Sequence, residues 1–173
     1  MDAAKESEPS RMKNRATLER KSERELVITR TINGPARIVF EAWTKAELFQ
    51  RWWLPKSFGI SLLSCEVDAR TGGTYRLVMR HGDLEMAFHG KYLEVTPHSR
   101  IVWTNDESGD AGAVSTVTFE ERAGKTLMVM HELYPSKEAL EAAMASGEKS
   151  GTDETLDQLD ELLASLGASS LAS

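Results

Sequence analysis

The residues of this chain best suited to chemistry are one cysteine, Cys65, and four histidines, His81, His89, His98 and His131. Histidine titrates near neutral pH and binds metals, so a group of histidines would indicate acid–base or metal chemistry. These four are too dispersed to predict a metal site, and a single cysteine excludes an internal disulfide and a thiolate cluster. Two histidines fall in expected turns and two on strand faces expected to point outward. We therefore predict no metal and no catalytic histidine.

Two other side chains could supply an acid or a base from inside the protein. Glu94 shares the strand parity of Tyr92, and burial would raise the pKa of such a carboxyl, although its place near a strand end favours solvent contact. Asp68 precedes Gly72-Gly73 and is expected to bind the backbone amides of that turn. No glycine-rich nucleotide loop, His-Glu-x-x-His or Gly-x-Ser-x-Gly motif occurs. We predict no cofactor, and the one enzymatic hypothesis left is a cyclase- or dehydratase-like protein using Glu94 or Tyr92.

Composition limits the classes further. The chain has 173 residues, of which 40% are hydrophobic and 28% charged, as in an ordinary globular domain. No apolar run is long enough for a membrane span, and residues 1–24 lack the apolar core of a secretory signal, so we expect a cytoplasmic protein. The net charge is −6, and beyond residue 24 the chain carries 14 basic against 22 acidic residues. Because such a domain repels phosphate, nucleic acid is excluded as a partner.

The elements that must position these residues follow two periodicities. Residues 25–32 alternate polar and apolar side chains and predict a strand. A turn at 33–35 then leads into apolar residues with helical spacing, at Val39, Ala42, Trp43 and Ala46. Strands separated by short turns follow, at 60–68, 73–81, 84–95, 99–104, 114–121 and 125–132. Such short connections predict antiparallel hairpins.

The C-terminal part is helical again. Ser136 is expected to cap one helix, and Thr152 a second with acidic residues in its first turn. The second helix carries an apolar stripe, formed by Leu156, Leu159, Leu162, Leu163 and Leu166. We expect a poorly ordered leader at 1–23, one domain at 24–166 and a tail at 167–173.

Three of the four tryptophans lie within eleven residues, at Trp43, Trp52 and Trp53. Thr44 and Glu47 have the spacing of a capping box, with Trp43 at the preceding staple position. A second short helix should therefore begin at Thr44 and be stopped by Pro55. These large rings either close the core or line a pocket, and the two interpretations are equally supported.

Hairpin register predicts which side chains share a face of the sheet. A two-residue loop at Gly82-Asp83 places Leu77 opposite Phe88 and Arg76 opposite His89, which gives one apolar and one charged face. The same reasoning places Tyr92 opposite Trp103 and Phe119 opposite Met128. The inner face is rich in methionine, which is frequent on adaptable binding surfaces. Together with flanking residues it predicts a ligand pocket formed by Trp52, Trp53, Tyr75, Leu77, Met79, Met86, Phe88, Tyr92, Trp103, Phe119, Met128, Met130, Met144 and Leu159. An ordinary methionine-filled core is the alternative.

The order of these elements resembles the α+β helix-grip fold of the START-like, or SRPBCC, superfamily, in which a curved antiparallel sheet wraps around a long C-terminal helix. The stretches that carry the resemblance are 43–55, 68–76, 90–97, 101–104 and 126–131, and they are most similar to relatives of the C-terminal domain of the activator of heat-shock protein 90 ATPase. One departure is Gly151-Thr152, where the family often has Gly-Trp.

The resemblance implies a cavity more than a reaction. The first hypothesis is a binding module without catalytic activity, which holds a small apolar or amphipathic ligand between the sheet and the last helix. The second is a chaperone-regulatory module acting on a heat-shock protein 90 homologue, and the third is the enzyme described above. Fold likeness alone does not decide between them.

Overall fold

The computed structural model describes residues 16–106, 112–145 and 151–172, and the side chains of 167–172 are outside the description. Eight strands form one antiparallel sheet: β1 (Thr17–Arg20), β2 (Glu25–Ile32), β3 (Ser61–Val67), β4 (Thr74–His81), β5 (Leu84–Thr96), β6 (Arg100–Thr104), β7 (Val114–Arg122) and β8 (Lys125–Leu133). The helical elements are α2 (Ala36–Thr44), α3 (Ala46–Phe49), the 3₁₀ turn η1 (Lys56–Phe58), α4 (Lys137–Ala145) and α5 (Thr152–Ala172). The predicted α+β helix-grip fold is confirmed.

The strand order in the sheet is β1-β2-β8-β7-β6-β5-β4-β3. The chain therefore pairs β2 with β8, and then fills the rest of the sheet by consecutive hairpins. The predicted registers are confirmed: Leu77 pairs with Phe88, Tyr92 with Trp103, and Phe119 with Met128. Register holds because a slip of one residue would move every apolar side chain to the solvent face.

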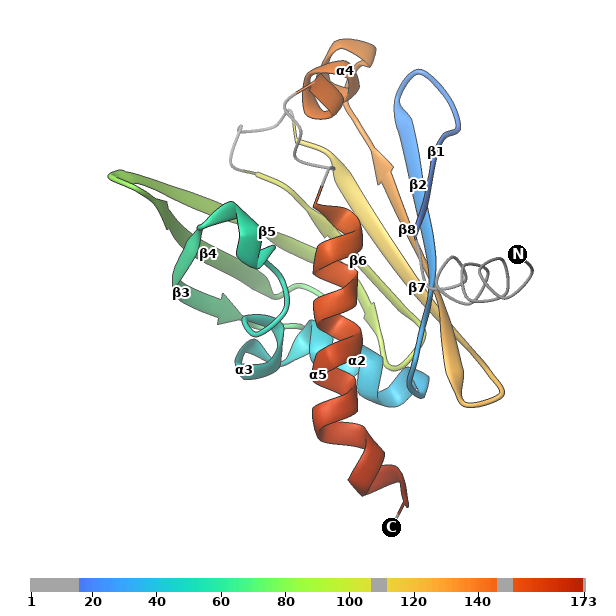
Figure 1. Ribbon diagram of the computed structural model, residues 1–173. Coiled ribbons are helices and arrows are strands. Elements are labelled where there is room, and N and C mark those ends of the chain that lie inside the picture. Colours follow the sequence, from blue (N-terminus) through green and yellow to red (C-terminus); the bar gives the residue numbers. More distant parts are fainter. Residues whose placement is uncertain (1–15, 107–111, 146–150, 173) are drawn as a thin grey trace, which may run out of the picture.

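The long helix α5 crosses the inner, concave face of this sheet, while α2 and α3 lie at one end and α4 at the other (Figure 1). The predicted leucine stripe of α5 faces the sheet, and Leu156, Leu159, Leu162 and Leu163 are buried. Burial of each leucine contributes roughly 1.5–3 kcal/mol relative to an exposed position. Among the helices of the described residues, none is long and apolar enough to cross a membrane.

Three local expectations differ from the structure. Thr17–Arg20 of the expected leader form strand β1 on β2, whereas residues 1–15 lie outside the described part. At the other end, α5 continues to Ala172 through the expected tail. The capping box at Thr44 is absent, because the Thr44 hydroxyl donates to the carbonyl oxygen of Phe40 at 2.9 Å inside α2, and Lys45 is the residue that precedes α3.

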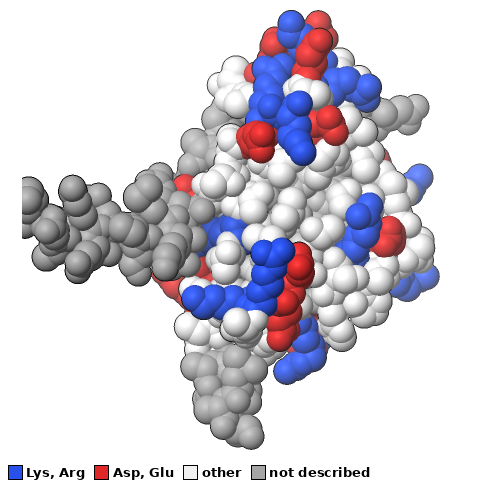
Figure 2. All heavy atoms as spheres, turned by 90° about the vertical axis from the view of Figure 1, so that its right-hand side faces the viewer, with Lys and Arg blue, Asp and Glu red and all other residues white. Residues whose placement is uncertain are grey.

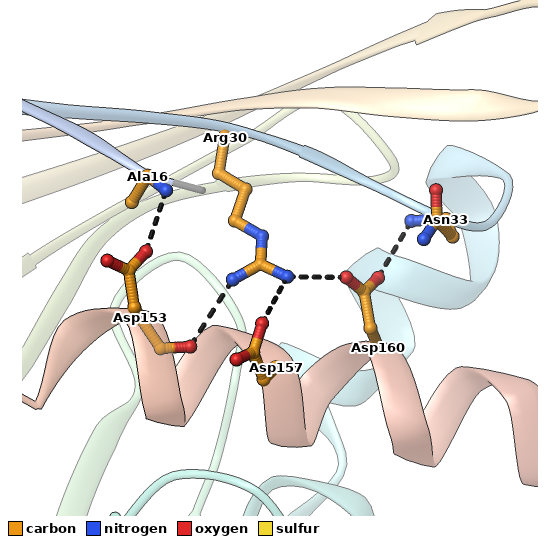
Figure 3. A network of polar contacts seen from close by, with 6 residues as sticks. All are labelled: Ala16, Arg30, Asn33, Asp153, Asp157 and Asp160. Carbon is orange, nitrogen blue, oxygen red and sulfur yellow. Dashed lines mark hydrogen bonds and ion pairs between the residues drawn. The ribbon is translucent and has the colours of Figure 1, made fainter. Parts of the chain in front are cut away.

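A buried arginine joins α5 to the sheet (Figure 3). The Arg30 side chain on β2 is only 1% exposed, and its Nη2 donates at 2.7 Å to both Asp157 Oδ1 and Asp160 Oδ2. Its Nη1 donates to the Asp153 carbonyl oxygen at 3.3 Å. Asp160 also accepts from the Asn33 amide at 2.8 Å. The helix is therefore fixed in both position and rotation relative to β2.

Burial and hydrogen bonding have opposite effects on the pKa of Asp160. Burial raises the pKa of Asp160 above its usual value, although the Asn33 amide and the Arg30 guanidinium both act to lower it. Because the pKa of Asp160 is higher in the folded than in the unfolded protein, the folded state holds its proton to a higher pH. The free energy of unfolding therefore falls as the pH rises through the folded pKa of Asp160. Arg30 limits that cost, since a buried carboxylate needs a paired charge.

On its other side α5 binds the segment that follows α3. Gln158 is buried, and its Nε2 donates to the carbonyl oxygens of Trp52 at 2.9 Å and Leu54 at 2.8 Å. Its Oε1 accepts from the Lys56 amide at 2.9 Å. Backbone groups that would otherwise be buried without partners are satisfied in this way. Helix α5 is thus held on both flanks.

We predict that Arg30→Met lowers the free energy of unfolding by about 3–5 kcal/mol at neutral pH, because Asp160 stays buried without its partner. Urea denaturation followed by circular dichroism measures the change. The matched control is Arg122→Met, which breaks an exposed pair with Glu120 and should change stability by less than about 0.5 kcal/mol.

The deficit of Arg30→Met should also depend on pH. Removal of the guanidinium raises the pKa of Asp160 further, so protonation relieves the unpaired charge and the deficit shrinks as the pH falls from 7 toward 5. A deficit that is constant over this range would show that Asp160 is not the group that Arg30 stabilises.

Candidate functional site

The fourteen predicted pocket residues fall into three groups. Seven are buried in the main core: Trp52, Leu77, Met79, Tyr92, Phe119, Met128 and Leu159. Five are half-buried and pack against that core: Trp53, Tyr75, Phe88, Trp103 and Met130. Two lie apart, because Met86 is near the tip of the β4–β5 hairpin and Met144 on α4 is 41% exposed, and neither belongs to a described core cluster.

Tryptophan rings fill the centre of the space between α2, α3 and the sheet. The Trp43 ring lies within 6.4 Å, centroid to centroid, of Phe49, Trp52, Trp53, Trp103 and Phe119. Trp52 is 1% exposed, and its Nε1 donates to the Ala42 carbonyl oxygen at 2.9 Å. Trp52 therefore closes the core, which is the first of the two interpretations that the sequence allows for the tryptophan rings.

The buried Trp43 is not among the predicted pocket residues, although its ring contacts four of them, Trp52, Trp53, Trp103 and Phe119. Its Nε1 is buried and has no hydrogen-bond partner in the part of the chain that the structure describes. A buried donor without a partner costs about 1–3 kcal/mol. Only the contacts of the folded structure reveal this, since the sequence does not show which indole lacks an acceptor.

The five half-buried side chains form what we call the aromatic rim: Trp53, Tyr75, Phe88, Trp103 and Met130. All of them contact the main core and also reach solvent. Trp53 stacks on Phe49 with ring centroids 4.7 Å apart, and Trp103 approaches Trp43 at 5.5 Å. A surface of this kind can pack against an apolar molecule at little cost in side-chain ordering, because its large rings are already ordered.

A glycine lets one rim residue lie across the sheet. Gly90 pairs with Tyr75, and a Cβ at Gly90 would lie 2.8 Å from the Tyr75 ring. The Tyr75 hydroxyl passes over β5 and donates to the Thr104 carbonyl oxygen at 2.7 Å. The close approach that glycine permits therefore fixes the orientation of Tyr75.

Polar side chains continue the inner face beyond Trp103. Ser115 on β7 pairs with Trp103 on one side and Glu132 on the other. Asn105 Nδ2 donates to Ser115 Oγ at 3.1 Å, and Asn105 Oδ1 lies 3.4 Å from the Tyr75 hydroxyl. The inner face thus combines an apolar rim with a hydrogen-bonded polar end. Strand parity would have found Ser115 and Glu132, because they alternate with the inward Val117 and Met130.

Glu94, which has the strand parity of Tyr92 but lies near a strand end, is in contact with solvent, as its strand-end position favours. A bulge between Tyr92 and Glu94 reverses the alternation, so that Val95 packs on the core and Glu94 forms an exposed pair with Arg100 at 3.1 Å. Burial raises the pKa of Tyr92, with smaller contributions from Cys65 and Asp68. Its phenol therefore stays protonated at neutral pH, and neither residue is suited to act as a base.

Other titratable residues lie outside the aromatic rim. His131 bonds Glu25 at 2.9 Å, which lowers the pKa of Glu25, and His98 packs its ring edge-on against Phe40. Burial raises the pKa of Cys65. In the residues that the structure describes, no group of three or more His, Cys, Asp or Glu could hold a metal ion.

Asp68 does not cap the Gly72-Gly73 turn as expected. Its carboxylate pairs with Arg70 Nε at 3.0 Å, and it borders a polar surface depression of about 210 Å³, lined by Glu66, Val67, Asp68, Thr74, Tyr75 and Arg76. On the side of the molecule that shows the β1–β2 edge, basic and acidic side chains lie beside one another instead of forming a continuous basic surface (Figure 2).

The sheet and the long helix that crosses it form the helix-grip fold, which is the fold of the SRPBCC, or START-like, superfamily. Solved structures agree: a protein from Rhodobacter sphaeroides matches with a TM-score of 0.80 at 21% identity, over 87% of this chain and 99% of that one. A protein from Staphylococcus epidermidis matches with a TM-score of 0.73 at 28% identity, over 86% and 94%.

Within that superfamily the chain belongs to the family described as "Activator of Hsp90 ATPase homolog 1-like protein", whose model matches residues 33–164. The AHSA1-like protein from Aeromonas hydrophila shares the fold, with a TM-score of 0.61 at 20% identity over 82% of this chain and 94% of that one. A search of curated proteins finds no match. The predicted family is therefore confirmed.

We predict that Gly90→Ala lowers the free energy of unfolding by about 1–3 kcal/mol, because the new methyl group would displace the Tyr75 ring or the Thr104 carbonyl. Tyr75→Phe removes only the hydroxyl and should cost about 1 kcal/mol. Urea denaturation measures both changes. If Gly90→Ala were neutral, Tyr75 would not be fixed across β5.

Proposed function

We propose that the protein binds a small apolar or amphipathic ligand against the aromatic rim, between the sheet and α5, and carries out no reaction on it. The observation that supports this most directly is that five large side chains of the inner face are half-buried although the same face forms the core. Monomeric proteins rarely leave such surface open without a use for it.

The polar end of the same face favours an amphipathic ligand. Asn105 and Ser115 lie beside Trp103 and already hold each other in place. A ligand polar group could bond there while its apolar part contacts Phe88, Trp103 and Met130. Binding sites for small molecules combine apolar walls with a few placed polar groups in this way.

The placement of the titratable groups supports binding without a reaction. Glu94 is paired at the surface, and Tyr92 is held protonated by burial. Glu132 faces inward, but it accepts a hydrogen bond from the Tyr134 hydroxyl at 2.8 Å. A general base needs access to the proton that it removes and a pKa near the working pH. Tyr92 does not meet the second condition, and Glu94 is paired with Arg100 away from the aromatic rim.

The test is protein-observed NMR of the full chain, titrated with libraries of fatty acids, isoprenoids and polycyclic aromatic compounds. We expect at least one class to bind and to shift the side-chain signals of Phe88, Trp103 and Met130. Phe88→Ala should weaken the best binder by about tenfold, because it removes one aromatic contact worth about 1.4 kcal/mol.

The matched control for Phe88→Ala is Leu93→Ala. Leu93 lies on the same strand, is 50% exposed and is outside the core clusters, so its truncation should leave the affinity unchanged. Equal losses in the two variants, or no shift of the rim signals by any class, would contradict ligand binding at this face.

A second candidate function rests on the family description, which names an activator of the Hsp90 ATPase. In this case the protein would raise the ATPase rate of an Hsp90 homologue in a way that saturates with its concentration. A coupled ATPase assay measures the rate, with an Hsp90 inhibitor to subtract contaminating activity. No change at a large excess of this protein would exclude the chaperone-regulatory role.

A further inference from the structure

Trp43 differs from its neighbour Trp52 in one respect. Both rings are buried, and their centroids are 5.0 Å apart. The Trp52 N–H donates to the Ala42 carbonyl oxygen, whereas the Trp43 N–H has no acceptor among the described residues. Buried polar groups without partners are rare in folded proteins, and each one calls for an explanation.

The surroundings of Trp43 bring its ring next to the aromatic rim. Of the five rings around Trp43, Phe49, Trp52 and Phe119 are buried, whereas Trp53 and Trp103 are half-buried rim residues at 5.6 Å and 5.5 Å. A molecule that displaces either rim ring would therefore reach the neighbourhood of Trp43. No other ring contact of Trp43 in the described part of the chain leads toward solvent.

We infer that the Trp43 N–H is the hydrogen-bond donor for the bound ligand, which must therefore carry a neutral acceptor oxygen on its apolar body, as in a ketone, ester or ether. This inference rests on the proposed function and narrows its ligand class. A carboxylate is a poor fit, because one N–H among aromatic rings does not compensate for the loss of its hydration. The class is an apolar or aromatic carbonyl or ether compound.

The test uses two probes of nearly equal shape, 2-acetylnaphthalene and 2-isopropenylnaphthalene, which differ by a carbonyl oxygen in place of a methylene group. Each is titrated into the full-length ¹⁵N-labelled protein. We expect the ketone to bind about tenfold more tightly than the alkene, because its oxygen would accept a hydrogen bond from the buried Trp43 N–H. The Trp43 indole proton should move downfield with the ketone only, and the Trp52 indole, already bonded, serves as the internal control.

Trp43→Phe keeps an aromatic ring and removes the N–H, so the two probes should bind this variant equally. If the variant does not fold, the indole signals of the wild-type protein decide the question. Equal binding of the probes to the wild type would overturn the inference and leave the proposed function intact. Binding of neither probe would count against both.

The competing explanation is a weak bond from the Trp43 N–H to the face of a neighbouring ring, which would need no ligand. Trp52 and Trp53 meet the Trp43 ring edge-to-face, at interplanar angles of 70° and 67°, and an N–H can point at a ring face. The indole proton would then resonate upfield in the free protein and stay there when the ketone is added. That result would also overturn the inference.

Discussion

The rest of the structure depends on the fixed position of α5 over the concave sheet. Arg30 supplies that constraint from one flank, because a guanidinium buried beside two carboxylates cannot slide without leaving a charge unpaired. Gln158 supplies it from the other flank through three hydrogen bonds to the backbone of residues 52–56. Hydrophobic packing of the leucine stripe alone would permit several rotations of the helix, since dispersion and burial are not directional. The polar contacts select one of them.

That choice determines what the inner face can do. With α5 fixed, Leu159 and Leu163 stay buried, whereas the residues of the aromatic rim pack on the same core and remain half-buried. Core and candidate site are therefore one continuous surface, divided by the position of a helix.

Much of the fold could be predicted from the sequence because alternation and turn residues are local signals. Strands β2 to β8 follow from them, as do the registers of the β4–β5 and β7–β8 hairpins and the pairing of Tyr92 with Trp103. Strand β1 could not be found, since its four residues are all exposed and carry no apolar alternation. The bulge beside Glu94 and the back-bonded Thr44 are set by tertiary contacts. The buried ion pairs of Arg30 are not predicted by the pattern of β2, where this charged residue merely interrupts an apolar face. The signal for them lies in the helix, since Asp153, Asp157 and Asp160 share one of its sides.

The tryptophan cluster shows why residue type alone cannot separate a core from a binding wall. Trp43, Trp52 and Trp53 are close in sequence and in mutual ring contact, yet their roles differ. Trp52 closes the core with a satisfied N–H, Trp53 reaches solvent, and Trp43 is buried with an N–H that has no partner among the described residues. Ring area, which stabilises all three, does not distinguish these roles. Hydrogen bonding does, because it is directional and costly to omit. The polar atoms of an apolar cluster are therefore the features that separate a residue that only closes the core from a candidate binding residue.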